Sequence, residues 1–194
     1  NTTIRIGNDD LFFDIGPNQK PFIIAELSGN HGQNLALAKR MVEEAARAGA
    51  HAIKLQTYTA ESMTLDVDSP DFVIKESDSL WAGEKLFNLY AKASTPYEWH
   101  SELFTLANSL GMLAFSSPFD EDAVDFLAQL NVPCYKIASF ELTDIPLIKK
   151  AAAQGKPLIM STGMASISDI EEALTAARGQ GCENIILLKC TSTY

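Results

Sequence analysis

The amino-acid sequence predicts an α/β fold, a (β/α)8 TIM barrel of which about six βα units are present in 194 residues. Six short apolar runs alternate with stretches whose apolar residues recur at helical spacing. The runs are apolar along most of their length, which is typical of strands buried on both faces of a parallel sheet. Polar residues follow the runs, at the strand ends where a barrel carries its active site.

The first segment lies outside these repeats. Residues 1–16, with "TIRIG" and "LFFDIG", predict an N-terminal β-hairpin that closes the bottom of the barrel. The chain is long enough for one sizeable domain and short for two. We therefore expect residues 1–194 to form a single, incomplete barrel domain.

Each expected strand is an apolar run closed by a polar or hydroxyl residue. The strands are "PFIIAEL" (21–27), "AHAIKLQTY" (50–58), "MLAFSS" (112–117), "PCYKIAS" (133–139), "PLIMST" (157–162) and "NIILLKCT" (184–191). A doubly wound sheet would also accommodate six such strands. No Gly-x-Gly-x-x-Gly follows any of them, so the dinucleotide-binding form of that fold is disfavoured and the barrel is preferred.

The expected helices carry an apolar face and recognisable ends. They span residues 34–49, 96–111, 120–130, 145–155 and 167–181. Gly49 is suited to end the first of them, and Ser168 with Glu171 predicts a capping box for the last. Residues 59–95 show no clear period and are too many for an ordinary connection, so this segment is either functional or partly disordered.

Composition excludes several classes of partner. The net charge of −10 argues against nucleic acid and anionic membranes, and no run of about 18 apolar residues exists. The N-terminus lacks an export signal, and the three cysteines have no metal-ligand spacing. We expect reduced thiols and a cytoplasmic protein that binds neither nucleic acid nor membrane.

Polar residues at the ends of the strands are expected to converge on one mouth of the barrel. These residues are Glu26, Lys54, Gln56, Ser116, Ser117, Lys136, Ser139, Ser161 and Thr162. Two lysines on strand ends favour an anion site, and hydroxyls with helix N-terminal amides suit phosphate. A glutamate that closes a buried strand is costly unless it is paired or functional.

These residues by themselves predict a barrel enzyme that acts on a phosphorylated small molecule. A lysine at a strand end also fits a Schiff-base aldolase, with Lys136 as the nucleophile. The three histidines, His31, His51 and His100, have no metal-ligand spacing.

Six motifs, in order along the chain, resemble one family, the sialic acid synthases, which condense phosphoenolpyruvate with an amino sugar. The motifs are "IAELSGNHGQ", "IKLQTY", "FSSPFD", "YKIASFE", "PLIMSTGM" and "LLKCTSTY". The resemblance covers residues 21–194. Within the family, "LWAGEKLFNLYAKASTPYEW" (80–99) is most similar to the pseudaminic acid synthases.

The resemblance implies roles for individual residues. Glu26 and Glu141 would handle protons or water. The phosphoenolpyruvate-binding residues would be Lys54, Ser117, Lys136, Ser139 and Ser161. Ser192 and Tyr194 would contact the sugar, together with Trp81 and Tyr90 of the long segment. The alternative for Trp81 and Tyr90 is simple packing of a helical turn under the loop.

The resemblance also implies a reaction. Phosphoenolpyruvate, 2,4-diacetamido-2,4,6-trideoxy-L-altrose and water would give pseudaminic acid and phosphate. A divalent metal, Mn²⁺ or Mg²⁺, would be bound by ligands that lie beyond Tyr194. The family's C-terminal antifreeze-like domain would also lie beyond Tyr194. The whole protein would be a homodimer. The alternatives are an N-acetylneuraminate or legionaminate synthase and, from another class, a non-catalytic phospho-ligand binding module.

Overall fold

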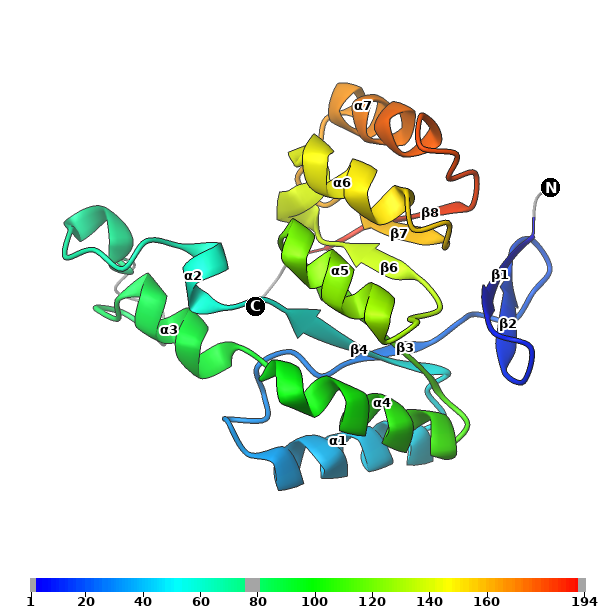
Figure 1. Ribbon diagram of the computed structural model, residues 1–194, viewed down its shortest axis with the longest axis horizontal. Helices are drawn as coiled ribbons and strands as arrows, with labels where there is room; N and C mark the ends of the chain where they lie inside the picture. The colour runs from blue at the N-terminus through cyan, green and yellow to red at the C-terminus, as the bar shows by residue number, and fades with distance from the viewer. Residues whose placement is uncertain (1–2, 76–80, 192–194) are drawn as a thin grey trace.

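The computed structural model describes residues 3–75 and 81–191, and its centre is a parallel sheet of six strands (Figure 1). The strands are β3 (Ile24–Glu26), β4 (Ala52–Thr57), β5 (Leu113–Pro118), β6 (Tyr135–Ile137), β7 (Leu158–Ser161) and β8 (Ile185–Leu188). They lie side by side in the order in which they follow along the chain. A doubly wound sheet reverses its order at a switch point. The unreversed order therefore confirms the predicted half-barrel.

Helices follow the strands and cover the outer face of the sheet. They are α1 (Leu35–Arg47), α4 (Tyr97–Ser109), α5 (Glu121–Gln129), α6 (Ile145–Ala152) and α7 (Ile167–Arg178). Asn34 caps α1 by accepting a hydrogen bond from Leu37 N at 3.0 Å, a contact type worth about 1 kcal/mol. Gly49, with φ of 87°, follows the last turn as expected.

The cap of α7 differs from the predicted one. Its capping box joins Ser166 and Asp169, each side chain bonding the other's backbone N–H, rather than Ser168 and Glu171. Both pairs have the Ser-x-x-acid spacing. The helix begins at Ile167, so Ser168 already lies in its first turn and cannot be the cap.

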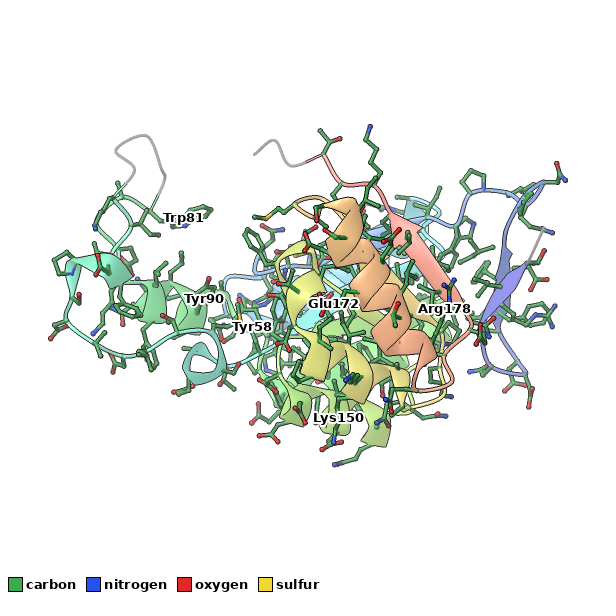
Figure 2. All side chains as sticks on the ribbon, turned by 90° about the horizontal axis from the view of Figure 1, so that it is seen from above. Tyr58, Trp81, Tyr90, Lys150, Glu172 and Arg178 are labelled. Carbon is green, nitrogen blue, oxygen red and sulfur yellow. The ribbon has the colours of Figure 1, made fainter. Side chains whose placement is uncertain are left out.

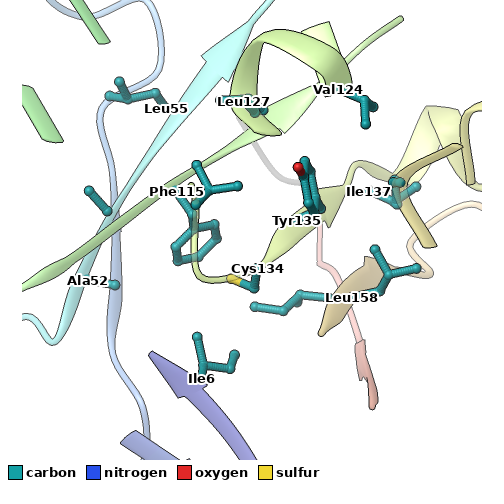
Figure 3. Packing of buried hydrophobic residues seen from close by; sticks show 14 of the residues in the cluster. Ile6, Ala52, Leu55, Phe115, Val124, Leu127, Cys134, Tyr135, Ile137 and Leu158 are labelled. Atoms are coloured by element: carbon teal, nitrogen blue, oxygen red, sulfur yellow. The ribbon is translucent and has the colours of Figure 1, made fainter. Parts of the chain in front are cut away.

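The N-terminal hairpin is formed by the antiparallel strands β1 (Ile4–Gly7) and β2 (Phe12–Ile15). Ile6 is fully buried and belongs to the same apolar cluster as Ala52 and Leu158 from the barrel strands and Cys134, which directly precedes β6 (Figure 3). The hairpin lies on the side of the sheet from which β4 begins (Figure 1). It therefore covers the bottom of the barrel, as expected.

The long connection from residue 58 to residue 96 is here called the β4–α4 segment. Its described part contains α2 (Ala60–Met63), a 3-10 turn (Pro70–Phe72) and α3 (Leu86–Ala93). The helix α3 was not predicted, because it is short and has no side-chain cap to mark its start. The segment extends beyond the ends of the strands, at the opposite end of the sheet from the hairpin (Figure 1).

Among the residues that the structure describes, no helix has the length and apolar character needed to cross a bilayer.

Candidate active site

Glu26 and Lys54 meet at the mouth of the half-barrel. They are register partners at the carboxyl ends of β3 and β4, and their side chains form an ion pair. The Lys54 side chain is 15% exposed and that of Glu26 is 36% exposed. Burial, and then repulsion from Lys136, lower the pKa of Lys54 to about 7, while the adjacent carboxylate acts in the opposite direction.

Lys136 supplies a second cation. It is 6% exposed, and its Nζ donates to the Ile137 carbonyl oxygen at 3.1 Å. Burial lowers the pKa of Lys136, and the nearby Cys190 and Glu141 oppose this. Lys136 lies on β6, two strands from Lys54 on β4, and its charge contributes to the lowered pKa of Lys54. An anion placed between the two ammonium groups would relieve their mutual repulsion.

Hydroxyl groups surround the Cys190 thiol beside Lys136. Ser139 Oγ lies 3.6 Å from Cys190 Sγ, and the backbone N–H of Gly163 donates to Ser139 Oγ at 3.4 Å. Burial by itself raises the pKa of the Cys190 thiol, but hydrogen bonds from Ser161 and Ser139, with the Lys136 charge, leave it lowered. The environment therefore favours negative charge.

Gly163 is required by this packing. A Cβ at this position would lie 2.8 Å from Cys190 Cβ and 3.0 Å from Ser139 Oγ. The loop after β7 therefore approaches Ser139 and Cys190 through its backbone alone. This close approach allows the Gly163 N–H to donate to the Ser139 hydroxyl.

Two adjacent serines of β5 separate to opposite faces of the strand. Ser117 is buried and pairs in register with Gln56, which lines the mouth two residues beyond Lys54. Ser116 was expected at the mouth, but its hydroxyl bonds Thr57 Oγ1 in the layer under α4. Successive strand residues alternate between faces, so only one of the two can reach the mouth.

Thr162 also departs from the expected convergence. Its hydroxyl donates to the Leu188 carbonyl oxygen at 3.1 Å, and its backbone N–H donates to the same oxygen at 3.0 Å. Thr162 therefore extends the hydrogen bonding between β7 and β8, and its hydroxyl is not directed at the mouth.

Glu141 follows β6 in a short 3-10 turn (Ser139–Thr143). Its Oε2 atom is buried and has no hydrogen-bond partner among the described residues. Burial raises the pKa of Glu141, against the influence of its own backbone N–H and of Lys136. A carboxyl group with a raised pKa holds a proton more readily near neutral pH, which suits an acid–base role.

A cavity of about 900 Å³ opens beside the Glu26–Lys54 pair. Its lining includes Glu26, Ser28, Gly29, Asn30, Lys54, Gln56, Tyr58, Trp81, Ala82, Glu84, Leu89, Tyr90, Lys92 and Ala93. Figure 2 shows Trp81 and Tyr90 on the arm formed by the β4–α4 segment, with Tyr58 toward the barrel. The predicted Trp81 and Tyr90 therefore share one cavity with Glu26 and Lys54.

The sequence analysis did not single out Tyr58, Glu84 or Lys92, which also line this cavity. Tyr58 contacts Tyr90 edge to face, with ring centroids 5.9 Å apart. Glu84 and Lys92 form an ion pair of 2.5 Å. The signal for Tyr58 was its place directly after β4, whereas Glu84 and Lys92 are eight residues apart with nothing local to associate them.

Two sugar-contact predictions, Ser192 and Tyr194, lie outside the described residues. Within the described ranges, no group of three or more His, Cys, Asp or Glu side chains is arranged to hold a metal ion. The described residues therefore supply no complete ligand set for a metal, whose ligands are predicted to lie beyond Tyr194.

The sequence matches the NeuB family over residues 41–194. The chain belongs to the NeuB family. It is 48% identical over 176 residues to a pseudaminic acid synthase of Helicobacter pylori, a match that covers 91% of this chain and 51% of that protein. It is 45% identical over 191 residues to a pseudaminic acid synthase of Campylobacter jejuni, covering 98% of this chain and 53% of that protein.

Solved structures of this family share the fold. The crystal structure of an N-acetylneuraminic acid (sialic acid) synthetase from Leptospira borgpetersenii, in complex with citrate, matches with a TM-score of 0.81 and 33% identity. That match covers 99% of this chain and 61% of the Leptospira chain. The NeuB chain described here thus spans about half the length of the curated relatives it matches.

Proposed function

We propose that the protein containing this chain is a transferase that condenses phosphoenolpyruvate with 2,4-diacetamido-2,4,6-trideoxy-L-altrose and water. The products are pseudaminic acid and phosphate. One observation carries the proposal: a cationic, hydroxyl-rich region and an aromatic cavity meet at the Glu26–Lys54 pair. The 48% and 45% identities to pseudaminic acid synthases support this choice of sugar.

The cationic region suits the phosphate and carboxylate of phosphoenolpyruvate. Lys54 and Lys136 offer two ammonium groups that repel each other until an anion lies between them. Ser139 and Ser161, which in this structure contact a thiol, can turn their hydroxyls toward phosphate oxygens. Ser117 joins them from β5 through its register with Gln56.

The two carboxyl groups suit the proton transfers of the reaction. The enol carbon of phosphoenolpyruvate forms a bond to the sugar aldehyde carbon, which leaves positive charge on the carbon that bears the phosphate. Water adds there and loses a proton; the C–O bond to phosphate then breaks while the new hydroxyl becomes the carbonyl, and the proton of that hydroxyl leaves with the phosphate. Glu26, at the junction of the two regions, stabilises the cation and accepts the proton from water. Glu141 supplies a proton to the aldehyde oxygen of the sugar.

The aromatic cavity suits a neutral sugar. Among the described residues, its charged side chains are two acids, Glu26 and Glu84, and two lysines, Lys54 and Lys92, each acid paired with a lysine. Trp81, Tyr90 and Tyr58 provide apolar surface for acetamido methyls and for the methyl that replaces a 6-hydroxyl. The part of the lining that the structure describes therefore carries no net charge that would attract a second anion.

The cofactor, assembly and compartment belong to the same proposal. We keep Mn²⁺ or Mg²⁺ as the expected cofactor, a homodimer as the expected assembly and the cytoplasm as the compartment. Chelation of metal followed by add-back of each ion, with phosphate release as the readout, tests the first. Light scattering of the whole protein tests the second.

The whole protein should be incubated with phosphoenolpyruvate and each candidate sugar in turn, while phosphate release and product mass are followed. Fastest turnover with the diacetamido-trideoxy sugar supports the proposal, and faster turnover with N-acetylmannosamine or the legionaminate precursor replaces it. Phosphoenolpyruvate binding without phosphate release would indicate a binding module.

A Schiff-base aldolase is the second candidate, because burial lowers the pKa of Lys136 and so favours its nucleophilic amine. Borohydride reduction distinguishes it. If borohydride traps substrate covalently on Lys136, that lysine is a nucleophile and does not serve to bind phosphate. If the enzyme keeps its full activity after the same treatment, no imine is formed.

A further inference from the structure

The returning end of the β4–α4 segment is held closely against the loop that follows β3. Gln33 Nε2 donates to the carbonyl oxygens of Lys92 and Ser94, at 3.1 and 2.5 Å. A Cβ on Gly29 would lie 2.8 Å from the Ala93 carbonyl oxygen. The end of α3 thus reaches the barrel along a defined path.

His31 adds a fully buried contact to this attachment. Its Nδ1 atom lies 3.2 Å from the backbone nitrogen of Gln33, whose N–H can only donate. The ring proton is therefore on Nε2, which donates to Thr95 Oγ1 at 3.1 Å. Burial lowers the pKa of His31, which favours the neutral ring that this arrangement requires.

His100 makes a second buried contact one turn into α4. Its Nδ1 lies 3.1 Å from the Pro96 carbonyl oxygen, which can only accept, so Nδ1 carries the proton. Nε2 therefore accepts from the Thr57 hydroxyl at 2.8 Å. Because the Thr57 hydroxyl donates its proton to His100, its Oγ1 atom accepts a hydrogen bond from Ser116 Oγ at 2.6 Å.

The two histidines thus have opposite tautomers, each selected by a backbone group, and each bonds a threonine hydroxyl. Together they connect both ends of the β4–α4 segment to the barrel. Thr57 precedes the segment on β4, and Thr95 lies next to its end. Neither imidazole is among the described residues that line the mouth cavity.

We propose that His31 and His100 are positioning residues that hold the β4–α4 segment at the mouth and thereby set the affinity for the sugar. The segment carries Tyr90, Glu84 and Lys92, which line the cavity. This inference rests on the proposed function, because it takes that cavity as the sugar site.

The anion region is expected to depend less on these contacts. Lys54 and Ser117 lie on β4 and β5, which are joined by six register pairs. Lys136 lies on β6, which pairs with β7. Loss of one threonine hydroxyl leaves these sheet contacts in place, whereas the segment loses one of its few buried polar attachments.

The first test uses Thr57→Val and Thr95→Val in the whole protein. Each valine keeps the threonine shape and leaves one imidazole nitrogen without its partner, and Thr57→Val also removes the acceptor of the Ser116 hydroxyl. The KM for the sugar should rise about tenfold, the factor expected for one lost buried hydrogen bond. The KM for phosphoenolpyruvate should change less than twofold.

Two controls separate positioning from stability. Thr57→Ser and Thr95→Ser keep the hydroxyl and should restore the KM for the sugar. Leu103→Val removes buried apolar volume from α4 without touching either hydrogen bond, so it should lower Tm without changing that KM. An unchanged sugar KM in folded Thr→Val variants, or an equal rise in Leu103→Val, overturns the proposal.

Hydrogen exchange provides a readout that does not depend on catalysis. Amides of α3 should exchange about tenfold faster in the two Thr→Val variants than in Leu103→Val, because local opening no longer has to break both buried contacts. If no sugar is turned over but α3 exchange still rises, the proposed function fails while the attachment stands. Unchanged α3 exchange overturns the attachment itself.

Discussion

Lys54 and Glu26 form an ion pair between neighbouring strands, and this pair lies at the junction of the two halves of the candidate site. Both residues line the aromatic cavity, and Lys54 also experiences the positive charge of Lys136. The junction is where a bond between phosphoenolpyruvate and a sugar would form. The pair can therefore influence both anion binding and the chemical step.

Glu26→Gln tests the chemical role of this pair. The amide keeps the size of the side chain and loses the charge that stabilises a cation and the basicity that accepts a proton. We expect kcat to fall by about 10²-fold or more, the scale of a positioned acid–base group. Phosphate release at saturating substrates provides the measurement.

Glu44→Gln is a suitable control, because Glu44 pairs with Arg47 on the exposed surface of α1. It should leave kcat unchanged. Near-normal turnover in Glu26→Gln would remove Glu26 from the mechanism.

The second prediction concerns the pH dependence of phosphoenolpyruvate binding. The pKa of Lys54 is lowered to about 7, so its ammonium form, which attracts the anion, is lost as pH rises above that value. Affinity should fall from pH 7 to pH 9, by up to about tenfold per pH unit above the pKa. Calorimetric titration at several pH values measures it.

Lys54→Arg should weaken this dependence, because a guanidinium stays protonated throughout the range. Glu26→Gln should move its onset to lower pH, because the carboxylate that favours the ammonium form is gone. A wild-type affinity that is constant from pH 7 to pH 9 would contradict the assignment of Lys54 to the anion.

Lys136→Ala tests the second cation. Removing it should weaken phosphoenolpyruvate binding by about 1.5–3 kcal/mol, the range for a hydrogen bond to a charged group. Lys156→Ala is the matched control, since Lys156 lies near the start of β7, at the other end of the sheet, and bonds Asn131. Equal affinities in the two variants would make Lys136 a structural residue only.

The elements of the barrel were predictable because each depends on a local pattern. A strand that is buried on both faces must be apolar along most of its length, and this pattern is visible in "LAFSS" and in "PLIMS". The exact cap of α7 was not predictable from spacing. Ser166 and Ser168 both have an acid three residues later, and only the start of the helix chooses between them.

The site was predictable only where a strand end carries one polar side chain. Glu26 and Lys54 could be associated because neighbouring parallel strands end at the same edge. Ser116 and Ser117 could not be separated without knowing which face of β5 points inward. The His100–Thr57 contact joins residues 43 positions apart, and no local pattern indicates it.

The fourth prediction is a dependence of stability on pH that arises from His100. Burial lowers the pKa of His100 to about 4, against the influence of Pro96, Tyr97 and Glu98, whereas the unfolded chain has the ordinary value of 6.5. Between these values only the unfolded state takes up the proton. The contribution of neutral His100 to the free energy of unfolding is thus complete above pH 6.5 and is lost as pH falls toward 4. It amounts to about 3 kcal/mol.

Urea denaturation at pH 4.5 and pH 7.5 measures this difference. His100→Gln should reduce the difference between the two free energies of unfolding, and His31, whose pKa is lowered in the same direction, should account for part of the remainder. An identical difference in wild type and His100→Gln would contradict the buried neutral imidazole.

The last prediction concerns the choice of sugar, in which the β4–α4 segment supplies the deciding surface. Trp81 and Tyr90 present rings to the cavity, where a 6-deoxy methyl gains contact and an added hydroxyl loses hydration. Since apolar pockets reject an added hydroxyl only modestly, the preference for the diacetamido-trideoxy sugar over N-acetylmannosamine should be about 10²-fold. Trp81→Ala and Tyr90→Ala should each reduce that ratio of kcat/KM values and leave the KM for phosphoenolpyruvate unchanged. Phe12→Ala, on the hairpin at the opposite end of the barrel, should change neither. A ratio that survives both ring deletions would show that selection takes place elsewhere at the mouth.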